Sequence, residues 1–249
     1  MASLRPELIV DIGGFPITNT FISTILVDIV ICVLLFVLSR KIALVPYGLQ
    51  SVFEPAIEYF YDLTEQIAGS KVTKIFPWFA SFFFFIFFTN IIGLLPGFGS
   101  IGFWETVREK GHATRELIPL FRAATSDFNV TLALGAISVV ATHAISLSYN
   151  GLFGYLKKFL SLNPIYLFIG LLEFLLEGIK IFSLSFRLFG NIYAGEVVLA
   201  TVGGLAAFLA PIPFLMLESI VAIVQALVFS MLTMVFMSLL ATTSHEGGH

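Results

Sequence analysis

Residues 213–242 read PFLMLESIVAIVQALVFSMLTMVFMSLLAT, an apolar run that contains a single charged residue, Glu218. About 20 apolar residues form a helix long enough to cross the hydrocarbon core of a bilayer. At about 1.5 Å per residue, this run would form a helix of roughly 45 Å. A helix of that length must tilt, bend or extend beyond the bilayer. The run therefore predicts a steeply tilted, membrane-crossing helix.

The composition of the whole chain agrees with a membrane protein. Of its 249 residues, 58% are hydrophobic and 12% are charged, whereas soluble domains average about 25% charged residues. So little charge cannot coat a soluble globule of this size, and disordered chains are polar and highly charged. The 20 glycines follow no three-residue period, which excludes a collagen-like chain. With soluble, disordered and collagen-like chains excluded, the composition indicates an integral membrane protein.

Net charge and cysteine content exclude further classes of protein. The formal net charge is -3, so the chain offers no large basic surface and we expect no nucleic-acid partner. The one cysteine, Cys32, lies in an apolar run and provides neither a disulfide framework nor a thiolate metal site. We expect no cofactor and no bound metal.

The last five residues, 245–249, read HEGGH and match the H-E-x-x-H pattern of zinc proteases. That chemistry requires a stable helix that sets two imidazoles one turn apart. Two glycines at this position disfavour such a helix, and the sequence suggests no third ligand. We interpret residues 243–249 as a solvated tail, and a membrane-bound hydrolase as the weakest alternative function.

Further apolar runs precede residues 213–242. The run at 21–39 is followed by two basic residues and has no small-residue cleavage site, which disfavours a cleaved signal peptide. The runs at 76–95 and 130–147 are also long enough to cross a membrane. The longest run, 163–202, would measure roughly 60 Å as a helix, about twice the hydrocarbon thickness. Glycines and prolines separate it from 213–242, which predicts that the two long helices form a hairpin.

Residues 48–70 differ from the spans, because apolar side chains recur there at steps of three and four residues with acidic side chains between them. This pattern predicts an amphipathic helix at the membrane interface. The segment contains no lysine or arginine, which favours packing against another helix over attraction to anionic lipid. The segments 1–19 and 99–127 have no long apolar run, and we interpret the second as a polar loop. We therefore expect an all-α integral membrane protein of one domain, with about five crossings and one interfacial helix.

Charged residues within the apolar runs are the most informative feature of the chain. A charge at the bilayer centre costs about 2.5–3.5 kcal/mol to insert, so such residues usually face a partner or a water-filled path. Seven charged residues lie in or beside the apolar runs: Asp28, Glu173, Glu177, Lys180, Arg187, Glu196 and Glu218. Most of them fall in the run 163–202, which is therefore the candidate for an ion path.

Helical angles place these charges on different faces. At about 100° per residue, Ser183 and Arg187 share one face, whereas Glu196 lies about 180° from Arg187. On the last helix, Glu218 and Gln225 share a face. One arrangement brings Glu196 and Glu218 together inside the hairpin while Arg187 points outward. The two carboxylates can accept and release protons, whereas an arginine stays protonated.

Several of these residues also have purely structural interpretations. Glu173, Glu177 and Lys180 can neutralise one another near the start of a helix. Asp28 can be a polar contact between helices. His143, in the run 130–147, can be a buried and hydrogen-bonded histidine. For each of these residues, a functional role and a purely structural role are therefore alternatives.

The run SFRLFGNIYAGE at 185–196 resembles the motif of subunit a, the proton-channel stator of rotary F-type ATP synthases. Three other runs resemble that family in the same order: NIIGLLP at 90–96, SDFNVT at 126–131 and QALVF at 225–229. The resemblance covers about residues 15–242. It implies a helical membrane subunit with two long, steep helices, which agrees with the length argument.

The resemblance also implies roles for individual residues. Arg187 would face a rotor ring of c subunits between two offset half-channels, with Asn191 and Gln225 beside it. Glu196 and Glu218 would line the half-channel that opens to the outside. The remaining candidates are secondary half-channel residues, namely Glu173, Lys180, Ser183, Asp127, Asn129, Asn90 and His143.

The resemblance therefore implies a proton-translocating stator subunit that drives rotation for ATP synthesis and is not an enzyme by itself. The expected partners are the c-ring, the b subunits of a peripheral stalk, membrane lipid and protons. Gly190 in the motif resembles bacterial and chloroplast members, so we expect a bacterial plasma membrane, with the thylakoid membrane as the alternative. An autonomous ion channel or a secondary transporter is the rival function, although transporters often contain internal repeats and none is visible in this sequence.

Overall fold

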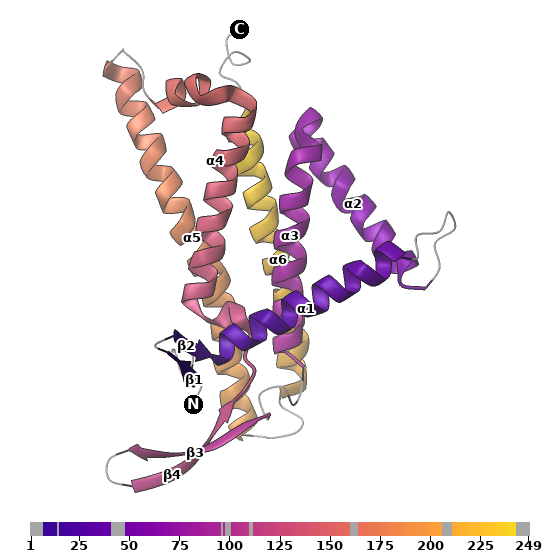
Figure 1. Ribbon diagram of the computed structural model, residues 1–249, viewed down its shortest axis with the longest axis vertical. Helices are drawn as coiled ribbons and strands as arrows, with labels where there is room; N and C mark the ends of the chain where they lie inside the picture. Colours follow the sequence, from indigo (N-terminus) through magenta and orange to yellow (C-terminus); the bar gives the residue numbers. More distant parts are fainter. Residues whose placement is uncertain are drawn as a thin grey trace. The chain divides into compact units, whose positions relative to one another are not determined.

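The computed structural model describes residues 7–13, 15–40, 48–95, 97, 101–109, 112–159, 164–205 and 211–242. The helices are α1 (Asn19–Arg40), α2 (Gln50–Ala68), α3 (Val72–Gly93), α4 (Phe128–Phe159), α5 (Pro164–Leu205) and α6 (Pro211–Ala241) (Figure 1). The strands and short 3₁₀ turns are β1 (Leu8–Ile12), β2 (Phe15–Thr18), η1 (Gly69–Lys71), β3 (Gly102–Glu109), β4 (His112–Pro119) and η3 (Ala124–Ser126). The chain divides into two compact units, each with its own core.

Within the described residues, four helical stretches are long and apolar enough to cross a membrane. These are Asn19–Arg40, Gln50–Gly93, Phe128–Lys157 and Pro211–Ala241. The helical membrane protein predicted from the sequence is therefore confirmed. α5 is longer than any of the other helices but carries five charged residues, and its crossing stays a prediction. Apolar side chains are exposed along α1, of which only 11% of the most apolar stretch is buried, as expected for a helix that faces lipid.

The amphipathic helix predicted over 48–70 is present as α2, which turns back through η1 into α3 (Figure 1). Gly69 ends α2 with φ 54°, a left-handed conformation that suits glycine, and its N–H donates to the carbonyl of Glu65. The ring of Phe60 packs on Phe79 and Phe83 of α3, with centroid distances of 5.5 and 4.6 Å. α2 thus packs against another helix, as its pattern suggests. Its position at a membrane interface stays a prediction.

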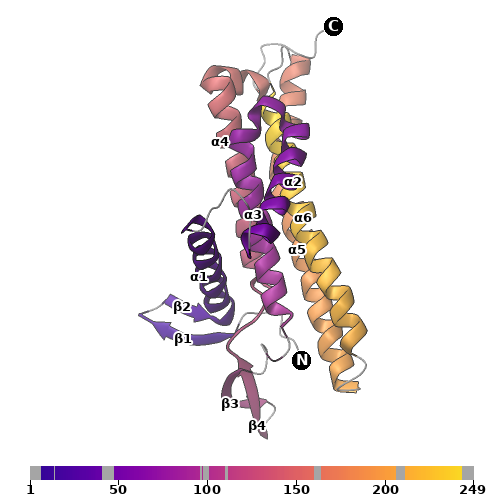
Figure 2. The same cartoon turned by 90° about the vertical axis from the view of Figure 1, so that its right-hand side faces the viewer.

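Two antiparallel hairpins lie outside the helices. β1 and β2 precede α1 directly (Figure 2), and β3 and β4 pair from Gly102 with Pro119 to Glu109 with His112. The interpretation of 99–127 as a polar loop misses this second hairpin. A two-stranded hairpin buries little apolar surface and is marginal by itself, so the sequence carries only a weak pattern for it.

The first unit comprises Met1–Val37, Phe84–Val130 and Leu188–Gln225. Buried apolar side chains of this unit are Val27, Ile86, Ala124, Leu188, Ile192 and Ala222. Polar contacts join α1 to the segment before α4: Thr20 Oγ1 donates to Asp127 Oδ2 at 3.1 Å, and the backbone N–H of Arg122 donates to Ser23 Oγ at 3.0 Å. These bonds fix the segment that carries Arg122.

The second unit comprises Leu38–Phe83, Thr131–Arg187 and Ala226–His249. Its helices approach closely at Gly135, where a Cβ would collide with Ser185 Oγ and the carbonyl of Ile181. α4 bends sharply at Gly151, whose φ of 67° and ψ of 171° are not helical (Figure 1). Because of this bend, Tyr155 lies against His143, 12 residues earlier in the same helix.

Candidate functional site

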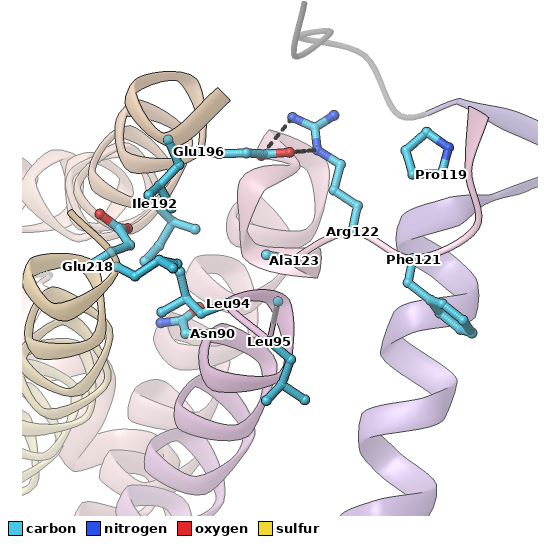
Figure 3. Close-up of a pocket in the computed structure, with 13 residues that line it drawn as sticks. Asn90, Leu94, Leu95, Pro119, Phe121, Arg122, Ala123, Ile192, Glu196 and Glu218 are labelled. Carbon is cyan, nitrogen blue, oxygen red and sulfur yellow. Dashed lines mark hydrogen bonds and ion pairs between the residues drawn. The ribbon is translucent and has the colours of Figure 1, made fainter. Parts of the chain in front are cut away.

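The first unit contains a cavity of about 260 Å³ (Figure 3). Four of its lining side chains are polar, namely Asn90, Arg122, Glu196 and Glu218. The other lining residues are apolar or glycine, among them Leu94, Ile192, Leu199 and Leu215. A water molecule occupies about 30 Å³ in the liquid, so the cavity can hold several waters around a small set of charged groups.

An ion pair between Arg122 and Glu196 forms one wall of this cavity (Figure 3). Arg122 Nε lies 3.0 Å from Glu196 Oε1 and 3.2 Å from Oε2, and a terminal nitrogen of the guanidinium lies 3.1 Å from Oε2. Two donors on one carboxylate make a charge-assisted pair that is stronger than neutral hydrogen bonds. The Arg122 side chain is 6% exposed and that of Glu196 is 32% exposed. Arg122 is therefore the buried member of the pair, and Glu196 is its partly exposed member.

Glu218 lies on another wall, contributed by α6, without such a partner. It is buried, and its Oε1 has no hydrogen-bond partner among the described residues. Gly195 of α5 makes room for it, because a Cβ at that position would overlap the Glu218 carboxylate. An ionised carboxylate is costly to bury without a partner. Binding a proton or contacting water would therefore lower the free-energy cost of burying the Glu218 carboxylate.

Asn90, which lines the cavity, connects three elements of the first unit. Its Nδ2 donates to the carbonyl of Ala222 at 3.4 Å, and its Oδ1 accepts from Thr125 Oγ1 at 2.5 Å. Asn90 thereby links α3 to α6 and to η3. Of the secondary candidates predicted from the sequence, Asn90 is the one that lines the cavity.

Asp127 and Asn129 do not line this cavity. Asp127 Oδ1 accepts from the backbone N–H of Asn129 at 2.9 Å and from its Nδ2 at 3.1 Å, at the first turn of α4. A carboxylate at that position caps the helix and satisfies one of its unpaired N–H groups. The geometry therefore gives Asp127 a structural task, independent of any part in ion transfer.

Arg187 is exposed, and so are Ser183 and Asn191 on the same face of α5. Leu188 and Ile192 of the same helix are buried. Gln225 of α6 is half-buried and lies outside the cavity lining. These three residues thus form an exposed polar face of α5, and its contact with another molecule stays a prediction.

The second unit contains a separate polar cluster. Glu177 is buried and forms an ion pair with Lys180 at 2.6 Å, and its Oε2 lies 3.9 Å from His143 Nε2. His143 Nδ1 is 3.0 Å from the hydroxyl of Tyr155. Glu173 is exposed and does not share the ion pair. Glu177 and Lys180 are thus ion-paired, as the neutralising interpretation expects, and His143 is hydrogen-bonded although only half-buried.

Arg122 is the functional candidate that the sequence analysis missed, because it lies in a segment without an apolar run. Its position five residues before Asp127, beside a recognisable motif, was the available signal. Among the described residues, no group of three or more histidine, cysteine, aspartate or glutamate side chains is placed to hold a metal ion. The H-E-x-x-H run at 245–249 lies outside the described part of the chain.

Comparisons with known proteins give one consistent result. The family model of the ATP synthase A chain matches residues 20–238. ATP synthase subunit a of Moorella thermoacetica is 28% identical and covers 96% of this chain and 97% of its own length. ATP synthase subunit a of Oceanobacillus iheyensis is 30% identical, with coverage of 94% and 96%. A sodium ion specific ATP synthase subunit a from Propionigenium modestum is 32% identical, with coverage of 92% and 76%.

Proposed function

Since the chain belongs to the ATP synthase A chain family, whose members are ion-translocating membrane subunits of F-type ATP synthases, we propose that it passes protons to and from the carboxylates of a c-ring through two offset half-channels. The cavity with Glu196 and Glu218 carries this proposal. It combines space for water with acidic groups inside an apolar membrane protein. Intramembrane ionisable residues of this kind mark ion paths.

Arg187 separates the two half-channels in this proposal. Its side chain is exposed on α5 and stays positively charged, because a guanidinium does not release its proton. It attracts a rotor carboxylate that has lost its proton and blocks direct flow between the half-channels. Asn191 shares the exposed face of α5, and in this proposal Gln225 of α6 acts together with Arg187. A rotor carboxylate that carries a proton is neutral and can move into lipid at low cost.

The proton on the outer side enters the cavity of the first unit, which Glu218 and Glu196 line, and passes from there to the rotor. Asn90 supports the wall of this cavity, and Asp127 and Asn129 hold the segment that carries Arg122. Each proton that crosses releases about 2.3 kcal/mol per 100 mV of membrane potential. This energy drives rotation, and the subunit itself performs no bond-making chemistry.

The second half-channel uses the polar groups of the other unit. Lys180 and His143 approach Glu177 there, and Ser183 and Glu173 are exposed on the same helix. The cluster around Glu177 and the two exposed groups together supply polar positions on α4 and α5. They are the candidates for the path by which protons leave.

The proposed partners are the c-ring and the b subunits of a peripheral stalk. The chain is a multi-pass membrane protein related to bacterial subunits a, and we place it in the bacterial plasma membrane, with the thylakoid as the alternative. Sodium is the second candidate ion, because one relative is named as sodium ion specific. Transport in vesicles with and without sodium distinguishes the two ions, since a proton-coupled enzyme needs no sodium.

The substitution Arg187→Ala tests the proposal in the complete ATP synthase reconstituted in vesicles. It should abolish ATP synthesis driven by an imposed proton gradient, because the two half-channels are no longer separated. Lys157→Ala is the matched control, since Lys157 is an exposed basic residue at the end of the α4 span. Normal synthesis by the Arg187 variant would reject the proposal. Rapid ion flux through the purified chain without a c-ring would instead support an autonomous channel.

A further inference from the structure

The two carboxylates of the cavity have different electrostatic surroundings. Glu196 contacts the guanidinium of Arg122 through both of its oxygens, at 3.0 to 3.2 Å. Glu218 forms no ion pair among the described residues, and its Oε1 has no hydrogen-bond partner there. Figure 3 shows the Glu196 side chain directed at Arg122, with the Glu218 side chain apart from this pair. Two groups in such different environments are poorly suited to the same task.

Arg122 cannot leave the pair easily. Its backbone N–H is bonded to Ser23 Oγ, its side chain is 6% exposed, and its guanidinium lies 6.0 Å from the ring centre of Tyr193. A buried guanidinium needs a counter-charge, because removing one member of a buried ion pair leaves an uncompensated charge. Glu196 supplies that counter-charge. Loss of Glu196 would remove the negative charge that faces the Arg122 guanidinium in this cavity.

A group that carries protons must gain and lose a proton in every cycle. For Glu196, each protonation would break an ion pair held by two donors. For Glu218, protonation removes an unpaired buried charge and breaks no contact that the described residues make. The absence of a Cβ at Gly195 leaves the space on α5 that the Glu218 carboxylate occupies.

From this contrast we propose that Glu218 alone carries protons through the cavity, while Glu196 is the fixed counter-charge of Arg122 and Arg122 is a positioning residue. The proposal rests on the proposed function and divides its outer half-channel into two tasks. A proton from cavity water forms an O–H bond at a Glu218 oxygen. That bond breaks when the proton passes to water on the rotor side and then to the rotor carboxylate. The Arg122–Glu196 pair keeps its net charge of zero throughout.

A double substitution separates the two tasks in the complete enzyme in vesicles. Glu218→Gln should lower passive proton flux by at least about tenfold, because an amide cannot carry the proton. Arg122→Gln and Glu196→Gln should each slow the flux, since each removes one charge of the ion pair and leaves the other charge of that pair beside the cavity. The combination of both should recover most of the lost flux, because the cavity is neutral again. Glu58→Gln, an exposed acid on α2, is the control.

Each outcome has a defined meaning. If the double variant is as slow as Glu196→Gln, Glu196 itself carries protons and the proposal is wrong. Parental flux in Glu218→Gln overturns it as well. The loss of function caused by Arg187→Ala is independent of these results, so failure of the channel assignment can be distinguished from failure of this division.

A conservative pair of variants covers the case in which the double variant does not assemble. Arg122→Lys keeps the positive charge and should restore flux relative to Arg122→Gln. Glu196→Asp keeps the counter-charge, so the pH profile of flux should match that of the parent. A displaced pH profile in Glu196→Asp would show that Glu196 titrates during transport and would contradict the proposal.

Discussion

Gly195 shows how a single missing side chain positions a functional group. A Cβ at this residue would overlap the carboxylate of Glu218, which is the end of a flexible side chain. Gly195→Ala should therefore displace Glu218 while leaving the backbone in place. The expected result is a loss of proton flux by a complex that still assembles, measured in reconstituted vesicles.

Gly178→Ala is the matched control for that variant. Gly178 lies in the same helix, and a Cβ there meets nothing within 4 Å. The control should keep its flux and gain slightly in helix stability, because alanine is the better helix former by about 1 kcal/mol. Equal flux losses in both variants would show that the α5 backbone, and not the position of Glu218, is responsible.

Asp127 was predicted as a half-channel residue, yet its contacts with Asn129 are those of a helix cap. Asp127→Ala should lower the free energy of unfolding by about 1 kcal/mol, the usual effect of losing an N-cap. Asp127→Asn keeps a capping oxygen and should restore most of the stability. Thermal unfolding of the purified complex in detergent measures both, with Asp62→Ala on the exposed face of α2 as the control. A flux loss in Asp127→Asn at normal stability would favour the transport role.

At the scale of elements, the bend in α4 depends on one residue. Gly151 has φ 67°, a conformation that costs roughly 1–2 kcal/mol for a residue with a side chain. Gly151→Ala should destabilise the bend and weaken the bond between Tyr155 and His143. Thermal unfolding should show the loss. Gly154→Ala, in the same arm without positive φ, should have little effect, and an equal loss in both variants would contradict this account.

The helices were the predictable elements, and the strands were not. The apolar runs at 21–39 and 213–242 correspond to α1 and α6 within two residues at each end, because burial in lipid requires an uninterrupted apolar stretch. α4 continues to Phe159, beyond the predicted end at residue 147. Its final part is an arm beyond a glycine bend, and a hydropathy pattern does not reveal such a continuation.

For the whole molecule, exposed apolar surface implies that this chain works within lipid and with partners. Large apolar side chains are exposed along α1 and in the first half of α5. We expect the chain to be purified from mild detergent together with a c-ring and a peripheral stalk, as the proposed stator role requires. Affinity purification followed by mass spectrometry tests this. Recovery of the chain alone, from membranes in which the c subunits are present, would count against the stator role.

The sequence by itself determined the class of protein, the long helices and the identity of the charged residues. These follow from composition and periodicity, because each apolar run and each buried charge has a local energetic meaning. Only the tertiary structure decided which charges meet. Arg122 and Glu196 are 74 residues apart, and no local pattern encodes their contact. Their ion pair exists because α1 and the segment before α4 hold Arg122 against α5, and that arrangement left Glu218 as the unpaired acid of the cavity.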